Sequence, residues 1–121
     1  MSHNVEGVKQ LTFTEVKELY DQSGTSPILI DVREIDEYTD AHIPGIPLIP
    51  MSEMANHADE FKRNEEYVFV CRSGRRSHEV AKFFQEHGIE NVANYDGGML
   101  EWEGPVKGGK ENVIKHAREL Y

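Results

Sequence analysis

The sequence has 121 residues, of which 38% are hydrophobic and 29% charged, and its formal net charge is −9. This length and composition are typical of one folded domain and exclude a disordered acidic tail. The acidic balance argues against general binding of nucleic acid or anionic lipid, which both require a basic surface. Because the sequence has neither an apolar stretch of roughly 20 residues nor the pattern of a signal peptide, we expect a cytoplasmic protein without a membrane partner.

The first predicted element is a helix that starts near residue 11, with Thr12 as its cap, and runs to about residue 23. Thr12 and Glu15 have the spacing of a capping box, in which each side chain bonds the other residue's backbone N–H. Leu11 and Val16 have the spacing of a hydrophobic staple across the same helix start. The Gly-Thr-Ser-Pro sequence that follows is expected to end this helix.

Apolar runs then alternate with helical patterns. A continuous apolar run without polar alternation indicates a strand that is covered on both faces. The predicted strands are residues 28–32, 48–50, 67–71 and 92–95, and the predicted helices are residues 52–61 and 77–87, followed by a short helix that holds Trp102. The predicted fold is therefore α/β, with a central, mostly parallel sheet and helices on both faces. In the longer helix we expect Ser77 to be the N-cap and Gly88 the stop.

One domain is expected over residues 1–121, with a core of about 11–105 and a C-terminal extension over 106–121. Apolar residues in the extension fit a single helical stripe, so a helix is expected there. They are Val113, Ile114, Ala117, Leu120 and Tyr121. Packing on the domain and binding of a partner are both open for this segment.

The segment that carries chemistry is the loop that joins the strand over 67–71 to the next helix. In open α/β sheets, ligands bind at the carboxyl ends of the strands, which is where this loop lies. A short curled loop can point successive N–H groups inward as an anion nest, and glycine supplies the necessary φ freedom. The helix N-terminus and three arginines add positive charge. The residues are Cys71, Arg72, Ser73, Gly74, Arg75, Arg76 and Ser77.

Cys71 is the only cysteine, which excludes an internal disulfide and suits a reducing compartment. Cysteines at the ends of apolar strands are more commonly buried and inert, and arginine clusters often hold nearby carboxylates. A thiol among cations at a helix N-terminus is instead expected to ionise readily and act as a nucleophile. The basic loop with its glycine favours this second interpretation for Cys71.

Other polar residues are expected to have structural roles. An Asp with an Arg two residues on, as in Asp31 and Arg33, more commonly ties loops together than reacts. His42 is expected in a turn, His78 on an exposed helix face and Trp102 in packing. The six histidines are scattered without the spacing of a metal site, so neither a metal nor a cofactor is expected.

From about residue 11 to 105 the sequence resembles a single-domain rhodanese, through three motifs in the family's order. These are Asp31-Val32-Arg33-Glu34 with Glu37-Tyr38 and Ala41-His42-Ile43-Pro44-Gly45; the loop from Cys71 to Ser77; and Tyr95-Asp96-Gly97-Gly98 followed by Trp102. The resemblance implies an enzyme that transfers sulfane sulfur. Cys71 would take sulfur from a small anionic donor, thiosulfate or a persulfide, and the resulting persulfide would pass it to cyanide or a thiol. The loop from Arg72 to Ser77 would bind the substrate and stabilise the persulfide through its N–H groups.

Two alternatives are open. A sulfur-carrier or persulfide-sensing module would exchange sulfur with a protein donor or acceptor and turn over little thiosulfate. The other alternative is a phosphatase or an arsenate reductase, as in the rhodanese-like phosphatases. Such phosphatases place an arginine six residues after the cysteine, where this sequence has Ser77, and Arg76 comes one position early. The shorter loop suits sulfur better than a phosphoryl group.

Overall fold

The computed structural model describes residues 3–22 and 26–121, so the predicted end of the first helix at residues 23–25 lies outside the described residues. A five-stranded sheet with the order β1-β2-β5-β4-β3 forms the centre. Its strands are β1 (His3–Val5), β2 (Val8–Leu11), β3 (Ile28–Asp31), β4 (Tyr67–Val70) and β5 (Val92–Tyr95). The β1–β2 pair is antiparallel and the other pairs are parallel, which confirms the α/β prediction.

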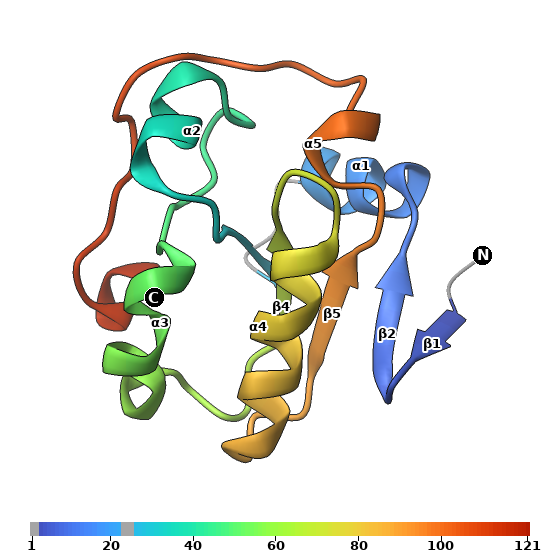
Figure 1. Ribbon diagram of the computed structural model, residues 1–121, viewed down its shortest axis with the longest axis vertical. Coiled ribbons are helices and arrows are strands. Elements are labelled where there is room, and N and C mark those ends of the chain that lie inside the picture. The colour runs from blue at the N-terminus through green and yellow to red at the C-terminus, as the bar shows by residue number, and fades with distance from the viewer. Residues whose placement is uncertain (1–2, 23–25) are drawn as a thin grey trace.

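The helices lie on both sides of this sheet (Figure 1). They are α1 (Phe13–Asp21), α2 (Ile35–Asp40), α3 (Met51–His57), α4 (Arg75–Glu86) and α5 (Gly98–Glu101), with 3₁₀ helices η1 (Ala58–Glu60) and η2 (Ala117–Leu120). Among the helices of residues 3–22 and 26–121, none is both long and apolar enough to cross a membrane.

Successive side chains of the central strands enter two separate clusters, because side chains in a strand alternate between its faces. Ile30 and Phe69 pack with α3, α4 and the C-terminal residues on one face. Leu29 and Val68 pack with α1 and the residues around Trp102 on the other face. Burial on both faces explains why β3 and β4 read as continuous apolar runs in the sequence.

The sequence prediction missed β1 and β2. Leu11 ends β2, and α1 starts after Thr12, whose capping box with Glu15 is present as predicted. Because Leu11 pairs with Tyr95 of β5, its backbone is extended rather than helical. Leu11 and Val16 are both buried in the same cluster, in agreement with the predicted staple.

The start of α4 also differs from the prediction. The N-cap is Gly74, whose φ of 88° leads the chain into the helix, and Ser77 lies inside the first turn. Ser77 is not a cap because its hydroxyl is used elsewhere, within the buried interior. The predicted stop at Gly88 is correct: its φ is 84° and its N–H donates to the carbonyl of Gln85.

Residues 106–121, which we call the C-terminal strap, cross over α2 and end beside α3 (Figure 1). The helix expected here is wrong except for the single turn of η2. The reason is backbone pairing: the N–H of Leu48 donates to Asn112, and the N–H of Ile114 donates back to Leu48. Leu48 in turn bridges to Asp31 of β3, as one bridge rather than the predicted strand over 48–50. The strap therefore continues the sheet edge beyond β3.

Candidate functional site

Cys71 directly follows β4, at the carboxyl end of the parallel strands, and is completely buried. Its Sγ accepts a hydrogen bond from the N–H of Gly74 at 3.1 Å. The hydroxyl of Ser77 lies 3.2 Å from the same sulfur. The loop therefore curls around the thiol, and the sulfur lies beside the first turn of α4.

The segment Asp96–Gly98 packs directly on this loop and fixes its shape. A Cβ on Gly74 would collide with the carbonyl of Asp96, and a Cβ on Gly98 would collide with the carbonyl of Arg72. The N–H groups of Met99 and Leu100 donate to the carbonyls of Cys71 and Arg72 at 2.9 and 3.0 Å. These bonds hold the carbonyls of Cys71 and Arg72. In a backbone nest for anions such carbonyls must point outward.

The three arginines of the loop have different surroundings. Arg76 makes a bidentate ion pair with Glu37 of α2, at 2.6 and 2.7 Å. The hydrogen bonds from Arg76 lower the pKa of Glu37 to about 2. Arg72 and Arg75 are exposed and have no ion-pair partner within the described part of the chain. Of the three predicted binding arginines, Arg76 therefore supports the loop, while Arg72 and Arg75 are free to meet an anion.

A buried polar network extends from the thiol into the sheet. The Ser77 hydroxyl contacts Asn94 Oδ1 of β5 as well as Cys71 Sγ. Asn94 Nδ2 donates to the carbonyl of Gly74 at 2.9 Å and to Gln10 Oε1 of β2 at 2.8 Å. The sequence analysis missed Asn94 and Gln10. An asparagine within an otherwise apolar buried strand was the available signal, because a buried amide requires partners.

The network reaches the surface at His78, which was predicted to be exposed. Its ring lies between Gln10 and Glu6 instead, with Nδ1 3.1 Å from Gln10 Nε2 and Nε2 2.8 Å from Glu6 Oε1. Since the Gln10 amide donates to Nδ1, the ring is in the tautomer that donates from Nε2 to Glu6. A hollow of about 370 Å³ beside the loop is lined by Ser73, Arg75 and His78.

The residues predicted to be structural are so in the fold. Asp31 and Arg33 form a buried bidentate pair, in which Arg33 Nε donates to Oδ1 and Nη2 to Oδ2, and Nη2 also donates to the carbonyl of Ala41 at 2.7 Å. His42 is fully buried rather than simply part of a turn. Its ring nitrogens face the carbonyl of Tyr38 and a carboxylate oxygen of Glu111. The second contact ties the strap to the segment that follows α2.

Two other features lie away from the cysteine loop. A hollow of about 510 Å³ lies at the opposite end of the sheet, where β4 and β5 begin, and none of its lining residues is a thiol. His57, Glu60 and His116 form the one group of three potential metal ligands among residues 3–22 and 26–121. The sequence did not predict it, because scattered histidines are brought together only by the fold.

Comparison with known proteins agrees with this geometry. Residues 12–105 match the rhodanese-like domain, and the chain belongs to this family. A crystal structure of a rhodanese-like domain protein from Staphylococcus aureus superposes with a TM-score of 0.73 at 32% identity, covering 84% of this chain and 98% of that one.

Two curated relatives extend the comparison. A Bacillus subtilis protein named "Putative sulfur carrier protein YrkF" is 38% identical over 106 residues, which are 88% of this chain and 57% of that protein. The chain thus spans little more than half the length of that relative. The thiosulfate:glutathione sulfurtransferase of Saccharomyces cerevisiae is 30% identical over 117 residues, with 84% of this chain and 82% of that protein covered. The family and these names support sulfur transfer in general.

Proposed function

We propose that this chain is a cytoplasmic sulfurtransferase that moves a sulfane sulfur from thiosulfate or a similar persulfide donor to a thiophilic acceptor. The reacting group is Cys71, and the intermediate is its persulfide. The observation that carries the proposal is the surroundings of Sγ: the Gly74 N–H donates to it, and the first turn of α4 lies beside it. A hydrogen-bond donor and a helix N-terminus both stabilise a sulfur anion at this position.

In the first step the Cys71 thiolate attacks the outer sulfur of thiosulfate. A new S–S bond forms, the S–S bond of the donor breaks, and sulfite leaves with the bonding electron pair. The persulfide carries one negative charge, which the N–H groups of the loop from Arg72 to Ser77 would stabilise. Exposed Arg72 and Arg75 attract the dianionic donor, while Arg76 holds the loop against Glu37.

In the second step cyanide or a thiolate attacks the terminal sulfur of the persulfide. The bond between the two sulfurs breaks, and Cys71 Sγ recovers the electron pair as a thiolate. Splitting the transfer in this way is ordinary nucleophilic covalent catalysis. The relative named thiosulfate:glutathione sulfurtransferase supports a thiol as acceptor.

The first test is the intact mass of the protein before and after thiosulfate is added. We expect the gain of one sulfur atom, its loss after a thiol rinse, and no gain in the Cys71→Ser variant. A folded protein that gains no sulfur but hydrolyses a phosphate ester through Cys71 would overturn the proposal in favour of a phosphatase.

A sulfur carrier that depends on a protein donor is the second candidate. Its support is the complete burial of the thiol, which hinders approach from solvent, together with the name of the B. subtilis relative. The two candidates differ in turnover of thiosulfate with cyanide by the protein alone. Repeated turnover supports the enzyme, whereas loading from thiosulfate that is much slower than loading from a persulfidated protein supports the carrier.

A further inference from the structure

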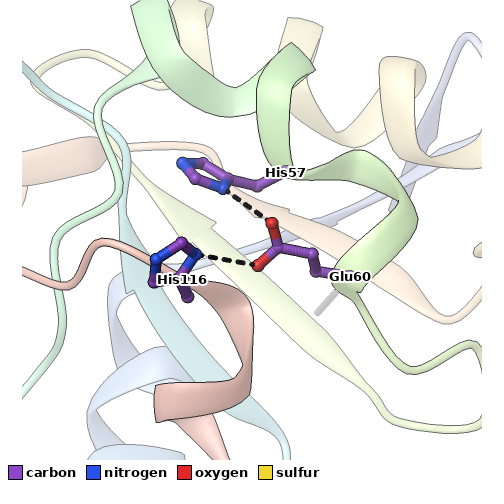
Figure 2. A group of neighbouring side chains, drawn as sticks. All are labelled: His57, Glu60 and His116. Atoms are coloured by element: carbon purple, nitrogen blue, oxygen red, sulfur yellow. Dashed lines mark hydrogen bonds and ion pairs between the residues drawn. The ribbon is translucent and has the colours of Figure 1, made fainter.

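Three side chains that bind transition metals converge where the C-terminal strap meets the end of α3. His57 is the last residue of α3, Glu60 ends η1, and His116 directly precedes η2 in the strap. Figure 2 shows both imidazole rings beside the Glu60 carboxylate, each joined by a dashed line to one of its oxygens. The two histidines are 59 residues apart in the sequence, so this arrangement exists only in the folded chain.

The separations between the ligand atoms fit a single ion. His57 Nδ1 lies 3.2 Å from Glu60 Oε2, and His116 Nδ1 lies 3.7 Å from Glu60 Oε1. All three ligand atoms fall within 4.8 Å of one another. Bonds of the usual zinc length place ligands of a tetrahedral ion about 3.3 Å apart. The 3.7 Å between His116 Nδ1 and Glu60 Oε1 is longer than a hydrogen bond, so His116 gains a closer partner when an ion binds.

The Glu60 carboxylate is already held in place by the strap. The backbone N–H of Ala117 donates to Glu60 Oε1 at 3.0 Å, which fixes the carboxylate against the strap. Outer contacts of this kind orient ligands and raise affinity at metal sites in general.

The surroundings leave room for the rest of the coordination shell. His57 and His116 line a surface hollow of about 460 Å³. Glu34 and Glu53 line it as well and oppose the charge of Lys115. Water from this hollow can therefore complete the four ligands.

We propose that His57, Glu60 and His116 bind a zinc-class divalent cation, which clamps the strap to the end of α3. Two imidazoles and one carboxylate select Zn²⁺, Co²⁺ or Ni²⁺ over Mg²⁺, which prefers oxygen ligands. Each imidazole binds through the lone pair of Nδ1, so an Nδ1 proton moves to Nε2 or to solvent as the ion enters. The site uses none of the residues of the cysteine loop, and it stands whether or not the sulfurtransferase proposal is correct.

The test is a calorimetric titration with ZnCl₂ of tag-free, metal-stripped protein that carries Cys71→Ser, which removes the thiol as a competing ligand. We expect one ion per chain, and affinity reduced about tenfold or more in each of His57→Ala, Glu60→Gln and His116→Ala. The matched control is His87→Ala, an exposed histidine at the end of α4, which should bind as the parent does. MgCl₂ should produce no saturable heat.

Amide hydrogen exchange locates the ion independently of affinity. Zn²⁺ should slow exchange in residues 112–120 of the parent and leave it unchanged in His116→Ala, whose half-exposed side chain can be removed without disturbing the core. The proposal is overturned if the three variants bind Zn²⁺ like the parent, if Mg²⁺ binds equally tightly, or if no stoichiometric binding occurs.

Discussion

At the residue scale, two separate features of the fold require glycine at position 74. Its φ of 88° lies where side chains are strained, and a Cβ would meet the carbonyl of Asp96. Gly109 has a similar φ of 94°, but nothing lies within 4 Å of the place where its Cβ would be. Comparison of the two glycines separates backbone strain from steric collision. A side chain at position 74 would suffer both, and one at position 109 only the strain.

We therefore expect Gly74→Ala to be more destabilising than Gly109→Ala. Strain in this region costs about 1–3 kcal/mol, and the collision adds to it at Gly74 by displacing the loop from Asp96. Urea denaturation of both variants measures the difference. Equal free energies of unfolding would show that Asp96 moves freely and that the loop is not held by this contact.

A second prediction concerns Asn94, which lies behind the thiol. Its amide donates to Gly74 and Gln10, so its oxygen is left to accept from the hydroxyl of Ser77. Asn94→Ala leaves buried polar groups unpaired and should cost about 1–3 kcal/mol. Loading of Cys71 with sulfur should slow as well, because the loop loses its support. The exposed Asn91→Ala is the control, and a similar stability for both variants would contradict the prediction.

At the scale of elements, the pair between Arg76 and Glu37 joins α4 to α2. Because the pKa of Glu37 falls from 4.5 to about 2 in the folded protein, the folded state holds this proton more weakly than the unfolded chain does. The pair is therefore fully stabilising above the unfolded pKa, and its contribution is lost as the pH falls through the folded pKa. Both side chains are partly exposed, so solvent and salt reduce the effect.

We expect the free energy of unfolding to fall between about pH 5 and pH 2, and Glu37→Gln to fall less steeply over the same window. Denaturation with urea at several pH values tests this. Other carboxyl groups, including Glu111, also have a lowered pKa, so the slope of the variant should be reduced but not removed. Parallel curves for the two proteins would rule out the pair as a contributor.

At the scale of the whole molecule, the strap shares the core on one face of the sheet. Ile114 and Ala117 are buried in the cluster that contains Phe69 and Phe84. We propose on this basis that residues 1–121 fold as one domain that includes the strap. Trp102 lies in the cluster on the opposite face and therefore reports on unfolding at a distance from the strap.

Ile114→Ala should lower the free energy of unfolding by about 2–5 kcal/mol, as large-to-small core substitutions do. Fluorescence of Trp102 and amide exchange in the strap should report one shared transition. Val106→Ala, at an exposed position of the same strap, should have little effect. Two separate transitions would mean that the strap is an appendage and not part of the domain.

Local patterns predicted the elements that depend on neighbouring residues. The capping box at Thr12, the stop at Gly88 and the buried run of β4 all rest on contacts or burial that short stretches of sequence encode. The missed features depend on distant partners. Gln10 is buried in β2 because Asn94 satisfies its amide, and the strap is extended because Leu48 offers it a backbone to pair with.

The candidate site follows the same division. The position of Cys71 after a buried strand and the need for Gly74 were both predictable, because chain direction and φ freedom are local properties. The different roles of the three arginines were not predictable, because Arg76 pairs with a carboxylate that lies 39 residues away in the sequence. The roles of Cys71 and of the loop from Arg72 to Ser77 in sulfur transfer remain predictions that the mass experiment addresses.

The bridges from Asp31 to Leu48 and from Leu48 to Val113 have a consequence for how the protein behaves at high concentration. A bare strand edge is a template on which other chains can add, and aggregation begins at such edges. Here the strap occupies the backbone N–H and C=O of Leu48 that would otherwise be open. A chain shortened before Asn112 should therefore self-associate and scatter light at concentrations where the full chain remains monodisperse.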